Sequence, residues 1–451
     1  MLHPRAVAAA ILIAGFATML FVNLPGHLEF DSIRQLLEGR RGVYSNWHPP
    51  IMSWLLGVAD AVTPGAALFV VFDAVLAYGA LLSVLWLTPR TSWIAAVAAA
   101  IVVALPQLFL FQAIVWKDML FADACVAAFV CLAHAAVQWR RPRLRFALLV
   151  GAACLAALAV LTRQNGIVVL PCAVLALAAI AWGYEGWRKA LFYGASFLAV
   201  SAALALVTNA ALQLRATRAL GAVEQIEDLQ LYDMAGMLQR SPDLPLPILD
   251  RDAPAMAKLL RRIGPPFYTP VGHDQLTDHP GVAPLIVPSV SAVSRQWRAL
   301  VLAHPADYLA VRMRDFGWIF LSTHPDACLT YEVGVSGDPA DLRAAGLAAR
   351  EDDRDDWLDD DYATPLIGTP VLSHPFFATA GLIALFVLLR RRRPADLAMA
   401  GLLASAMLYT LSYFFIAISC EYRYLFALDL STIAALFYLA ADWRTSPMRA
   451  D

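Results

Sequence analysis

The chain has 451 residues, of which 60% are hydrophobic and only 16% are charged, and its mean hydropathy is +0.61. A soluble domain is closer to about half apolar and about a quarter charged, so the composition excludes an ordinary soluble protein and indicates a polytopic membrane protein. The net charge of −2 and the lack of a basic tract give no indication of a nucleic-acid partner.

Apolar runs recur along the chain, and each can cross about 30 Å of hydrocarbon as a helix. We predict an all-α fold with about ten transmembrane helices, at 6–23, 66–87, 92–111, 118–138, 146–162, 166–183, 190–212, 373–390, 396–417 and 423–441. Only Arg5 precedes the first run and no small-residue cleavage site follows it, which is typical of a retained anchor. The run 51–63 is too short to span and carries Asp60, so we expect an interfacial helix there.

Basic residues predict the orientation of the spans, because cytoplasmic connections are enriched in Lys and Arg. With the N-terminus inside, each strongly basic connection falls inside: Thr88–Ser92, Trp139–Arg145, Tyr184–Lys189, Arg390–Pro394 and the tail from Trp443 with Arg444 and Arg449. Both termini are then cytoplasmic. The first loop, 24–65, and the long segment 213–372 face the other side.

Three domains follow from this pattern: a membrane domain at 1–212, an extracytoplasmic domain at 213–372 between spans seven and eight, and membrane helices at 373–451. Helical periodicity at Ala222–Leu238 and Pro288–Phe320 predicts that the outer domain is rich in α-helix. The proline-rich stretch 241–287 is predicted as a loop. The acidic run Glu351–Asp361 is interpreted as a solvated loop rather than a cation site, because its spacing does not match a calcium loop.

Some residues of the outer segments keep two interpretations. Tyr232–Asp233 and His304–Pro305 either line an acceptor site or are packing and capping residues. Of the six cysteines, four lie in apolar runs and are expected to be inert core residues: Cys125, Cys131, Cys154 and Cys172. Cys328 and Cys420 lie outside those runs, and the sequence leaves their pairing open.

The first outer loop carries an unusual set of polar residues. Asp31 begins Asp31–Gln35 and is predicted to cap a helix, or else to take a proton from an acceptor hydroxyl. His48 lies in Asn46–Pro50, whose prolines are expected to open the interfacial helix. We interpret His48 as a ligand of the site or, slightly favoured, as a structural residue beneath it.

Basic residues stand at the outer mouths of three different spans. Lys117, Arg163 and Arg423 would each be interpreted alone as a side chain that snorkels to the headgroups. Together they form a predicted site for a lipid phosphate, which Lys and Arg bind through charge-assisted hydrogen bonds. The residues predicted to orient the substrate are His48, Asp118, Gln164, Asn165, Glu421 and Tyr424.

These motifs resemble the GT-C membrane glycosyltransferases, which include protein O-mannosyltransferases and the bacterial aminoarabinose transferases of lipid A. The resemblance covers 1–212 and 373–441 in short motifs. It implies a GT-C-like fold in a bacterial inner membrane, with Asp31 as the catalytic acid/base residue. It also implies a polyprenyl-phosphate sugar as donor and a glycan, lipid or protein as acceptor.

Two departures from that family bear on the prediction. Ser32 follows Asp31 where many relatives have a second acid, which makes a bound divalent metal less expected, and no cofactor is indicated. The outer domain also lies between spans rather than at the C-terminus. Two alternatives remain. One is a flippase or transporter of lipid-linked saccharides, and the other is a polysaccharide polymerase or ligase that uses a lipid-diphosphate donor.

Overall fold

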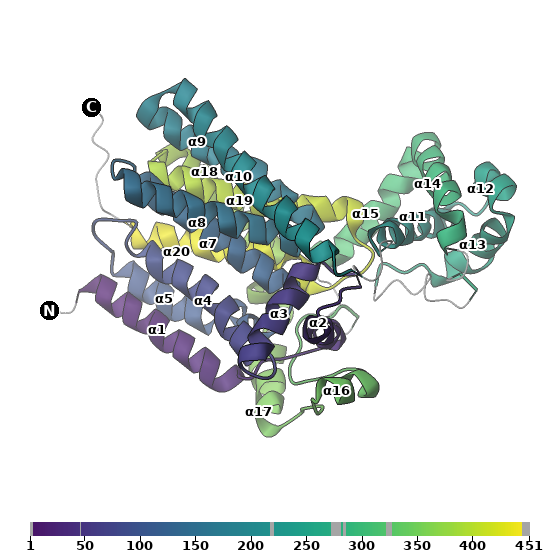
Figure 1. Ribbon diagram of the computed structural model, residues 1–451, viewed down its shortest axis with the longest axis horizontal. Helices are drawn as coiled ribbons and strands as arrows, with labels where there is room; N and C mark the ends of the chain where they lie inside the picture. The colour runs from purple at the N-terminus through teal and green to yellow at the C-terminus, as the bar shows by residue number, and fades with distance from the viewer. Residues whose placement is uncertain are drawn as a thin grey trace.

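The computed structural model describes residues 3–45, 47–216, 221–271, 281–282, 286–321 and 327–443. Asn46 and the basic tail with Arg444 and Arg449 lie outside the described residues. The described chain is helical, and its β-structure consists of isolated bridges. A helical bundle lies on the left of Figure 1 and a smaller helical domain projects on the right, so the predicted all-α fold is confirmed.

Nine helices of the described residues are long and apolar enough to cross a membrane, and one bent helix pair would make a tenth span. The nine are α1 (Pro4–Asn23), α4 (Ala67–Val84), α7 (Lys117–Val137), α8 (Pro142–Thr162), α9 (Val169–Glu185, extended by the 3₁₀ turn Gln164–Val168), α10 (Trp187–Gln213), α18 (His374–Arg391), α19 (Pro394–Ile416) and α20 (Phe426–Ala441, with the turn Tyr422–Leu425). The prediction of a polytopic membrane protein is therefore confirmed.

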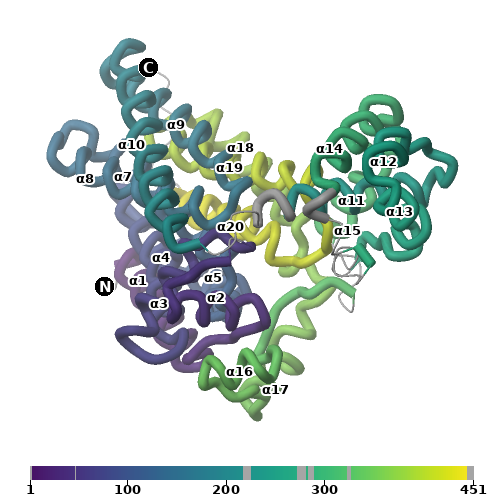
Figure 2. The backbone as a smooth tube through the Cα atoms, turned by 45° about the vertical axis from the view of Figure 1, so that its right-hand side comes forward, coloured from purple at the N-terminus to yellow at the C-terminus, as the bar shows by residue number. Residues whose placement is uncertain are grey.

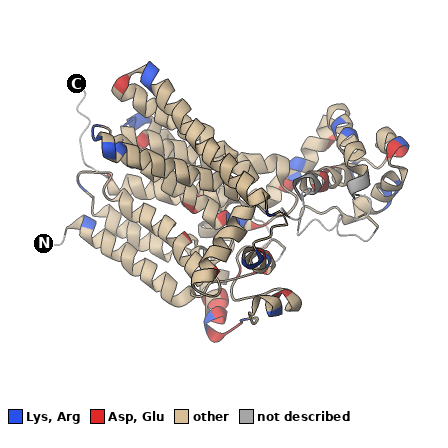
Figure 3. Ribbon diagram, in the orientation of Figure 1, with Lys and Arg blue, Asp and Glu red and all other residues tan. Residues whose placement is uncertain are grey.

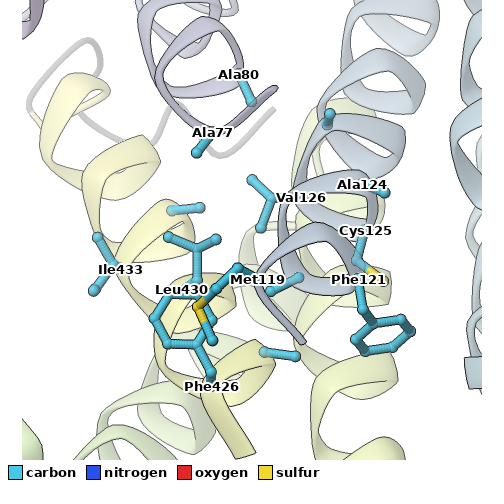
Figure 4. Close-up of a cluster of buried hydrophobic side chains, with 14 of the residues drawn as sticks. Ala77, Ala80, Met119, Phe121, Ala124, Cys125, Val126, Phe426, Leu430 and Ile433 are labelled. Carbon is cyan, nitrogen blue, oxygen red and sulfur yellow. The ribbon is translucent and has the colours of Figure 1, made fainter. Parts of the chain in front are cut away.

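Helix α7 lies at the centre of the bundle, where it packs against α4, α8, α19 and α20. Figure 4 shows the contact of α4, α7 and α20, in which the small Ala77 and Ala80 face the larger Met119, Val126 and Leu430. Small residues allow helices to approach closely in a membrane, where the hydrophobic effect adds little to helix association. The site described below lies at one end of this tightly packed core.

The predicted span 92–111 is not one straight helix. It consists of α5 (Ile94–Ala104), α6 (Pro106–Phe109) and a 3₁₀ turn (Phe111–Ala113), with a bend of 68° at the break. Pro106 has no backbone N–H to donate and restricts the residue before it, so Leu105 is extended, with φ −71° and ψ 141°. The end of this span thereby meets the first loop, where the His27 N–H donates to the Ala113 carbonyl at 2.9 Å.

Two short helices connect the first two spans. Helix α3 (Pro50–Val62) begins at Pro50 and is too short to span, as predicted for 51–63. Helix α2 (Phe30–Arg41) crosses α3 with backbone contact, because a Cβ on Gly39 would lie 2.2 Å from the Ser53 carbonyl oxygen, and one on Gly57 would lie 2.5 Å from the Gly39 carbonyl oxygen. Only glycine fits at this crossing.

The basic connections share one end of the bundle. Arg5 donates to the Thr88 carbonyl (2.7 Å), Arg145 pairs with Glu185 (2.8 Å), and Arg391 pairs with Asp396 (3.0 Å). Figure 3 shows Lys and Arg gathered at this end, where the N-terminus lies. The predicted grouping is therefore present among the described residues, whereas its cytoplasmic side stays a prediction.

The domain that is predicted to lie outside contains α11 (Gly221–Arg240), α12 (Pro247–Asp252), α13 (Pro254–Phe267), α14 (Ile286–Ala303) and α15 (Pro305–Leu321). The prediction of a loop at 241–287 is wrong for α12 and α13, because Pro247 and Pro254 occupy first-turn positions where proline is tolerated. The loop prediction is confirmed at 241–246 and 268–271, whereas 272–280 and 283–285 lie outside the described residues. The predicted helix 288–320 is two helices, broken before Pro305.

Helix α15 returns from this domain to the bundle, where it packs on α18 and α19 (Figure 2). Asp233 and Arg312 form a fully buried ion pair, and Trp297 donates to Asp233 at 2.8 Å. Tyr232 is buried and its hydroxyl donates to the Thr269 carbonyl. Tyr232 and Asp233 therefore hold the domain together and do not line an open surface.

Between α15 and α18 the chain forms α16 (Pro339–Ala345), α17 (Asp353–Asp356), a π-helix (Trp357–Ala363) and two 3₁₀ turns, Thr364–Leu366 and Pro370–Leu372. The acidic run Glu351–Asp361, predicted as a loop, is thus mostly helical. Asp352 caps α17, and the buried Asp355 pairs with Arg350 at 2.8 Å. Most of the other acids in the run are exposed.

Cys328 and Cys420 form a disulfide that closes a loop of 92 residues, with their Cα atoms 5.2 Å apart. The backbone N–H of Tyr422 also donates to the Leu329 carbonyl at 2.9 Å. The outer segment is therefore fastened to the turn that precedes α20. Among the free cysteines, Cys125 and Cys172 are buried as predicted, whereas Cys154 lies on an exposed face of α8 and is not a core residue.

We expect Cys328→Ser to lower the free energy of unfolding by about 2–4 kcal/mol, because the disulfide restricts the unfolded chain over a long loop. Thermal unfolding of the purified protein in detergent measures the loss. Cys154→Ser, at an exposed free cysteine, is the matched control and should leave the midpoint unchanged. An equal midpoint for Cys328→Ser and wild type would contradict a formed disulfide.

Candidate active site

The first turn of α2 carries two acids with different roles. Glu29 is the N-cap, since its carboxylate accepts from the Asp31 N–H at 2.9 Å while the Ser32 hydroxyl accepts from the Glu29 N–H at 3.2 Å. The prediction that Asp31 caps this helix is therefore wrong. Because Glu29 satisfies the helix end, the Asp31 side chain is left to point into the space between the loops.

Asp31 lies between a histidine and an arginine from distant parts of the chain. Its Oδ1 is 3.3 Å from His48 Nε2, and its Oδ2 accepts from Arg423 Nη2 at 3.2 Å. The side chain keeps 24% of its surface exposed. Burial alone would raise the pKa of Asp31, but the hydrogen bond with His48 and the charge of Arg423 hold that pKa well below its ordinary value. Asp31 is therefore ionised at neutral pH.

Glu29 is a second acid beside Asp31, and no sequence motif indicated it. Its Oε1 accepts from Trp116 Nε1 at 3.2 Å and from Arg423 Nη1 at 3.3 Å. Burial and the negative charge of Asp31 raise the pKa of Glu29 above its ordinary value. Two carboxyl groups with pKa values shifted in opposite directions are typical of a site that handles protons. Arg423 supplies the positive charge between them.

His48 contacts the site directly. Lys117 Nζ lies 2.7 Å from His48 Nδ1, and an ammonium group can only donate, so Nε2 carries the proton and donates to Asp31. Burial and the charge of Lys117 lower the pKa of His48. His48 is thus a neutral imidazole that links Lys117 to Asp31, and its two predicted roles, a ligand of the site or a structural residue, both stay predictions.

The predicted basic residues lie around two aromatic rings. The Arg423 guanidinium, paired with Glu421, lies 5.0 Å from the centre of the Trp116 ring, and the Arg163 guanidinium lies 5.2 Å from the centre of the Tyr424 ring. Arg163 pairs with Asp118, and its Nε is buried without a hydrogen-bond partner. Glu421 also accepts from the Tyr424 hydroxyl at 3.2 Å.

Two other predicted residues lie further from Asp31. Gln164 donates to Gln225 of α11 at 3.2 Å, which places it at the junction of the bundle and the outer domain. Asn165 donates to Ser412 of α19 at 2.9 Å, away from the acidic pair. Of the predicted site residues, six are joined by direct contacts: Asp31, His48, Lys117, Glu421, Arg423 and Tyr424. Arg163 and Asp118 form an ion pair that adjoins them.

Glu332 is an acid close enough to Glu29 and Arg423 to be affected by their charges, and no sequence motif indicated it. The stretch after the disulfide runs beside the start of α2, with Leu28 N–H donating to the Gly334 carbonyl at 3.0 Å. Burial and the charge of Glu29 raise the pKa of Glu332 to about 7, although the hydrogen bond that the Ser336 hydroxyl donates to Glu332 lowers that pKa. The sequence held one signal: pairing of Cys328 with Cys420 would have brought Glu332 toward Glu421.

A groove begins at this cluster and opens along the bundle. Its cavity of about 410 Å³ is lined by Pro49, Pro50, His48, Gln164, Val160, Leu161, Ile167, Ala205, Leu206, Asn209 and Gln213. Ile167 and Leu206 keep 60% and 69% of their surface exposed, so the groove faces the surroundings of the bundle. His48 is the residue of the Asp31 cluster that lines the groove, and most of the other lining residues are apolar.

Neither a protein-family model nor a curated protein matches the sequence. Solved structures with some similarity in shape include the oligosaccharyltransferase AglB of Archaeoglobus fulgidus in complex with an inhibitory peptide and a dolichol-phosphate (16% identity, TM-score 0.43). Two others are the Archaeoglobus fulgidus oligosaccharyltransferase tethered with an acceptor peptide (17%, 0.43) and the same enzyme in complex with Zn and sulfate (16%, 0.41). Each match covers 96% of this chain but 50%, 49% and 51% of the respective neighbour, so the chain spans about half the length of these proteins.

Proposed function

We propose that the protein is a GT-C membrane glycosyltransferase that transfers a sugar from a polyprenyl-phosphate donor to an acceptor at the extracytoplasmic face. The observation that supports it best is the ionised Asp31, held between His48 and Arg423, with His48 also lining a groove whose walls are mostly apolar. A charged carboxylate, a set of cations and a groove suited to a lipid chain are what such a transfer requires.

In the proposed reaction Asp31 accepts the proton of the acceptor hydroxyl. The acceptor oxygen bonds to the anomeric carbon, and the bond from that carbon to the phosphate oxygen breaks. The electron pair leaves with the lipid phosphate, whose charge Lys117, Arg163 and Arg423 stabilise. Attack from the face opposite the leaving group would invert the anomeric centre.

The low pKa of Asp31 has a consequence for this reaction. Such a carboxylate is always charged but is a weak base while Arg423 contacts it. A lipid phosphate that draws Arg423 toward itself would weaken that contact and increase the proton affinity of Asp31. In this proposal, donor binding therefore prepares the base.

The proposed lipid position follows from the groove. The isoprenoid chain would lie against Leu161, Ile167 and Leu206, with the phosphate near Lys117. His48, Asp118, Gln164, Asn165, Glu421 and Tyr424 would orient the sugar or acceptor, although Asn165 would act from behind the site.

For sidedness, the basic end of the bundle would face the cytoplasm of a bacterial cell, with the site on the periplasmic side of the inner membrane. The disulfide beside the site supports this placement, because disulfides persist in oxidising compartments.

Asp31→Asn should lower the rate of sugar transfer by about 10²–10⁴-fold, because the amide cannot accept the proton. The measurement is the rate at which the purified protein transfers sugar from a polyprenyl-phosphate sugar. Size-exclusion chromatography verifies that each variant is folded. Asp356→Asn changes an exposed carboxylate of the acidic run and should keep the wild-type rate. A folded Asp31→Asn variant with the wild-type rate would refute the proposed base.

Lys117→Met should raise the KM for the lipid donor by about 10–100-fold, because a charge-assisted hydrogen bond contributes about 1.5–3 kcal/mol. Donor titrations with a lipid monophosphate and a lipid diphosphate measure this and also distinguish the monophosphate-dependent transferase from a ligase. Lys189→Met, at the opposite end of the bundle and exposed, is the control. An unchanged KM would remove Lys117 from the phosphate site.

Glu332 is protonated below about pH 7 and charged above it. The charged form adds a negative group near Arg423, so we expect the transfer rate to fall as the pH rises through 7. In Glu332→Gln, which stays neutral, this fall should disappear. Transfer rates of wild type and Glu332→Gln between about pH 6 and about pH 8.5 test this prediction. If the rate of the variant still falls, the titrating group is not Glu332.

A further inference from the structure

Two carboxyl groups lie inside the bundle and have no part in the proposed reaction. Asp73 of α4 and Asp123 of α7 keep 2% and 0% of their surface exposed. Each lies six residues from the end of its helix that is nearer the site, which is about 9 Å at 1.5 Å per residue. Both are therefore within the apolar part of their spans.

The two side chains are in hydrogen-bond contact with each other. Two carboxylates without protons repel, so a hydrogen bond between them requires a proton on one of them. Among the described residues, the charged or titratable groups that act on the pair are the two acids themselves, with the Cys125 thiol near Asp123. Without a Lys, Arg or His, ionisation of both acids would leave two uncompensated charges in the membrane.

Polar atoms without partners surround the pair. Asp73 Oδ1, Asp123 Oδ2, Gln112 Oε1 and Gln107 Oε1 are buried and have no hydrogen-bond partner. Buried carboxyl oxygens are normally hydrogen-bonded, and a proton on one of the two carboxyl groups adds a donor to the pair.

A hydrogen-bonded chain runs from the pair toward the site. Gln112 Nε2 donates to Asp123 at 3.1 Å and to the Gln107 carbonyl at 3.4 Å, and Gln107 Nε2 donates to the Tyr422 hydroxyl at 3.3 Å. Tyr422 donates to Asp429, which His374 contacts at 3.0 Å. Tyr422 immediately precedes Arg423, so the chain ends under the turn that carries the site arginine.

We propose that Asp73 and Asp123 form a proton-binding site within the membrane, in which one proton is shared between the two carboxyl groups, and that this site supports the Arg423 turn through Gln112, Gln107 and Tyr422. The ligand is a proton and not a metal cation, because the described residues contain no group of three or more His, Cys, Asp or Glu side chains that could hold a metal ion. The proposal does not depend on the transfer reaction.

Infrared spectroscopy of the full-length protein in lipid nanodiscs tests the proton site, because a protonated carboxyl group has a C=O band distinct from that of a carboxylate. We expect this band to be lost in Asp73→Asn/Asp123→Asn and shifted in each single variant. Asp356→Asn should leave it unchanged. A full band in the double variant would overturn the proposal. If the double variant does not fold, unshifted bands in both single variants would overturn it instead. A band that changes between sodium chloride and choline chloride would also overturn it, by indicating a sodium site.

Hydrogen exchange measured by mass spectrometry tests the link to the turn. Gln112→Leu should keep the infrared band but increase the exchange rate of the Cys420–Tyr424 backbone by about tenfold. The leucine cannot donate, so the hydrogen-bonded chain from Asp123 to Tyr422 is broken. Ser201→Ala, a buried polar change on α10 outside the chain, is the control. An unchanged exchange rate in the folded Gln112→Leu variant would overturn the supporting role.

Discussion

The buried guanidinium of Arg423 is the charge on which the arrangement of the site depends. It keeps only 7% of its surface exposed and contacts Glu29, Asp31 and Glu421. A buried charge that lost its partners would cost several kcal/mol, so these acids and the arginine hold one another in place. Through them the first loop, the central helix with Trp116 and the final span meet at one point, although they are far apart in the sequence.

The outer segment contributes to this point as well. The disulfide and the Leu329 carbonyl hold the Arg423 turn from one side, while Tyr422 and Asp429 hold it from within the bundle. The turn is thus fixed from two directions.

The sequence predicted the parts of the fold that depend on hydropathy, because spans of about twenty apolar residues and basic connections are local patterns. It also grouped Asp31, Lys117, Arg163 and Arg423 at one end of the bundle. The pairs within the site depend on the crossing of α2 and α3 and on contacts between distant spans, which no local pattern encodes. Glu29 was missed because a capping acid two residues from Asp31 looks like an ordinary helix start. The helices α12 and α13 were missed because proline in a first turn resembles proline in a loop.

The contact of Gly39 with Gly57 has a consequence for how such a protein could diversify. It fixes the helix that begins beside Asp31 against the helix that begins after His48 through their own backbones. The crossing that positions the reacting groups therefore lies in the first loop, and the projecting part meets it through Gln225 of α11, which accepts from Gln164. Substitutions in the projecting helices could change which molecule is presented to Asp31, while the chemistry beneath stays the same.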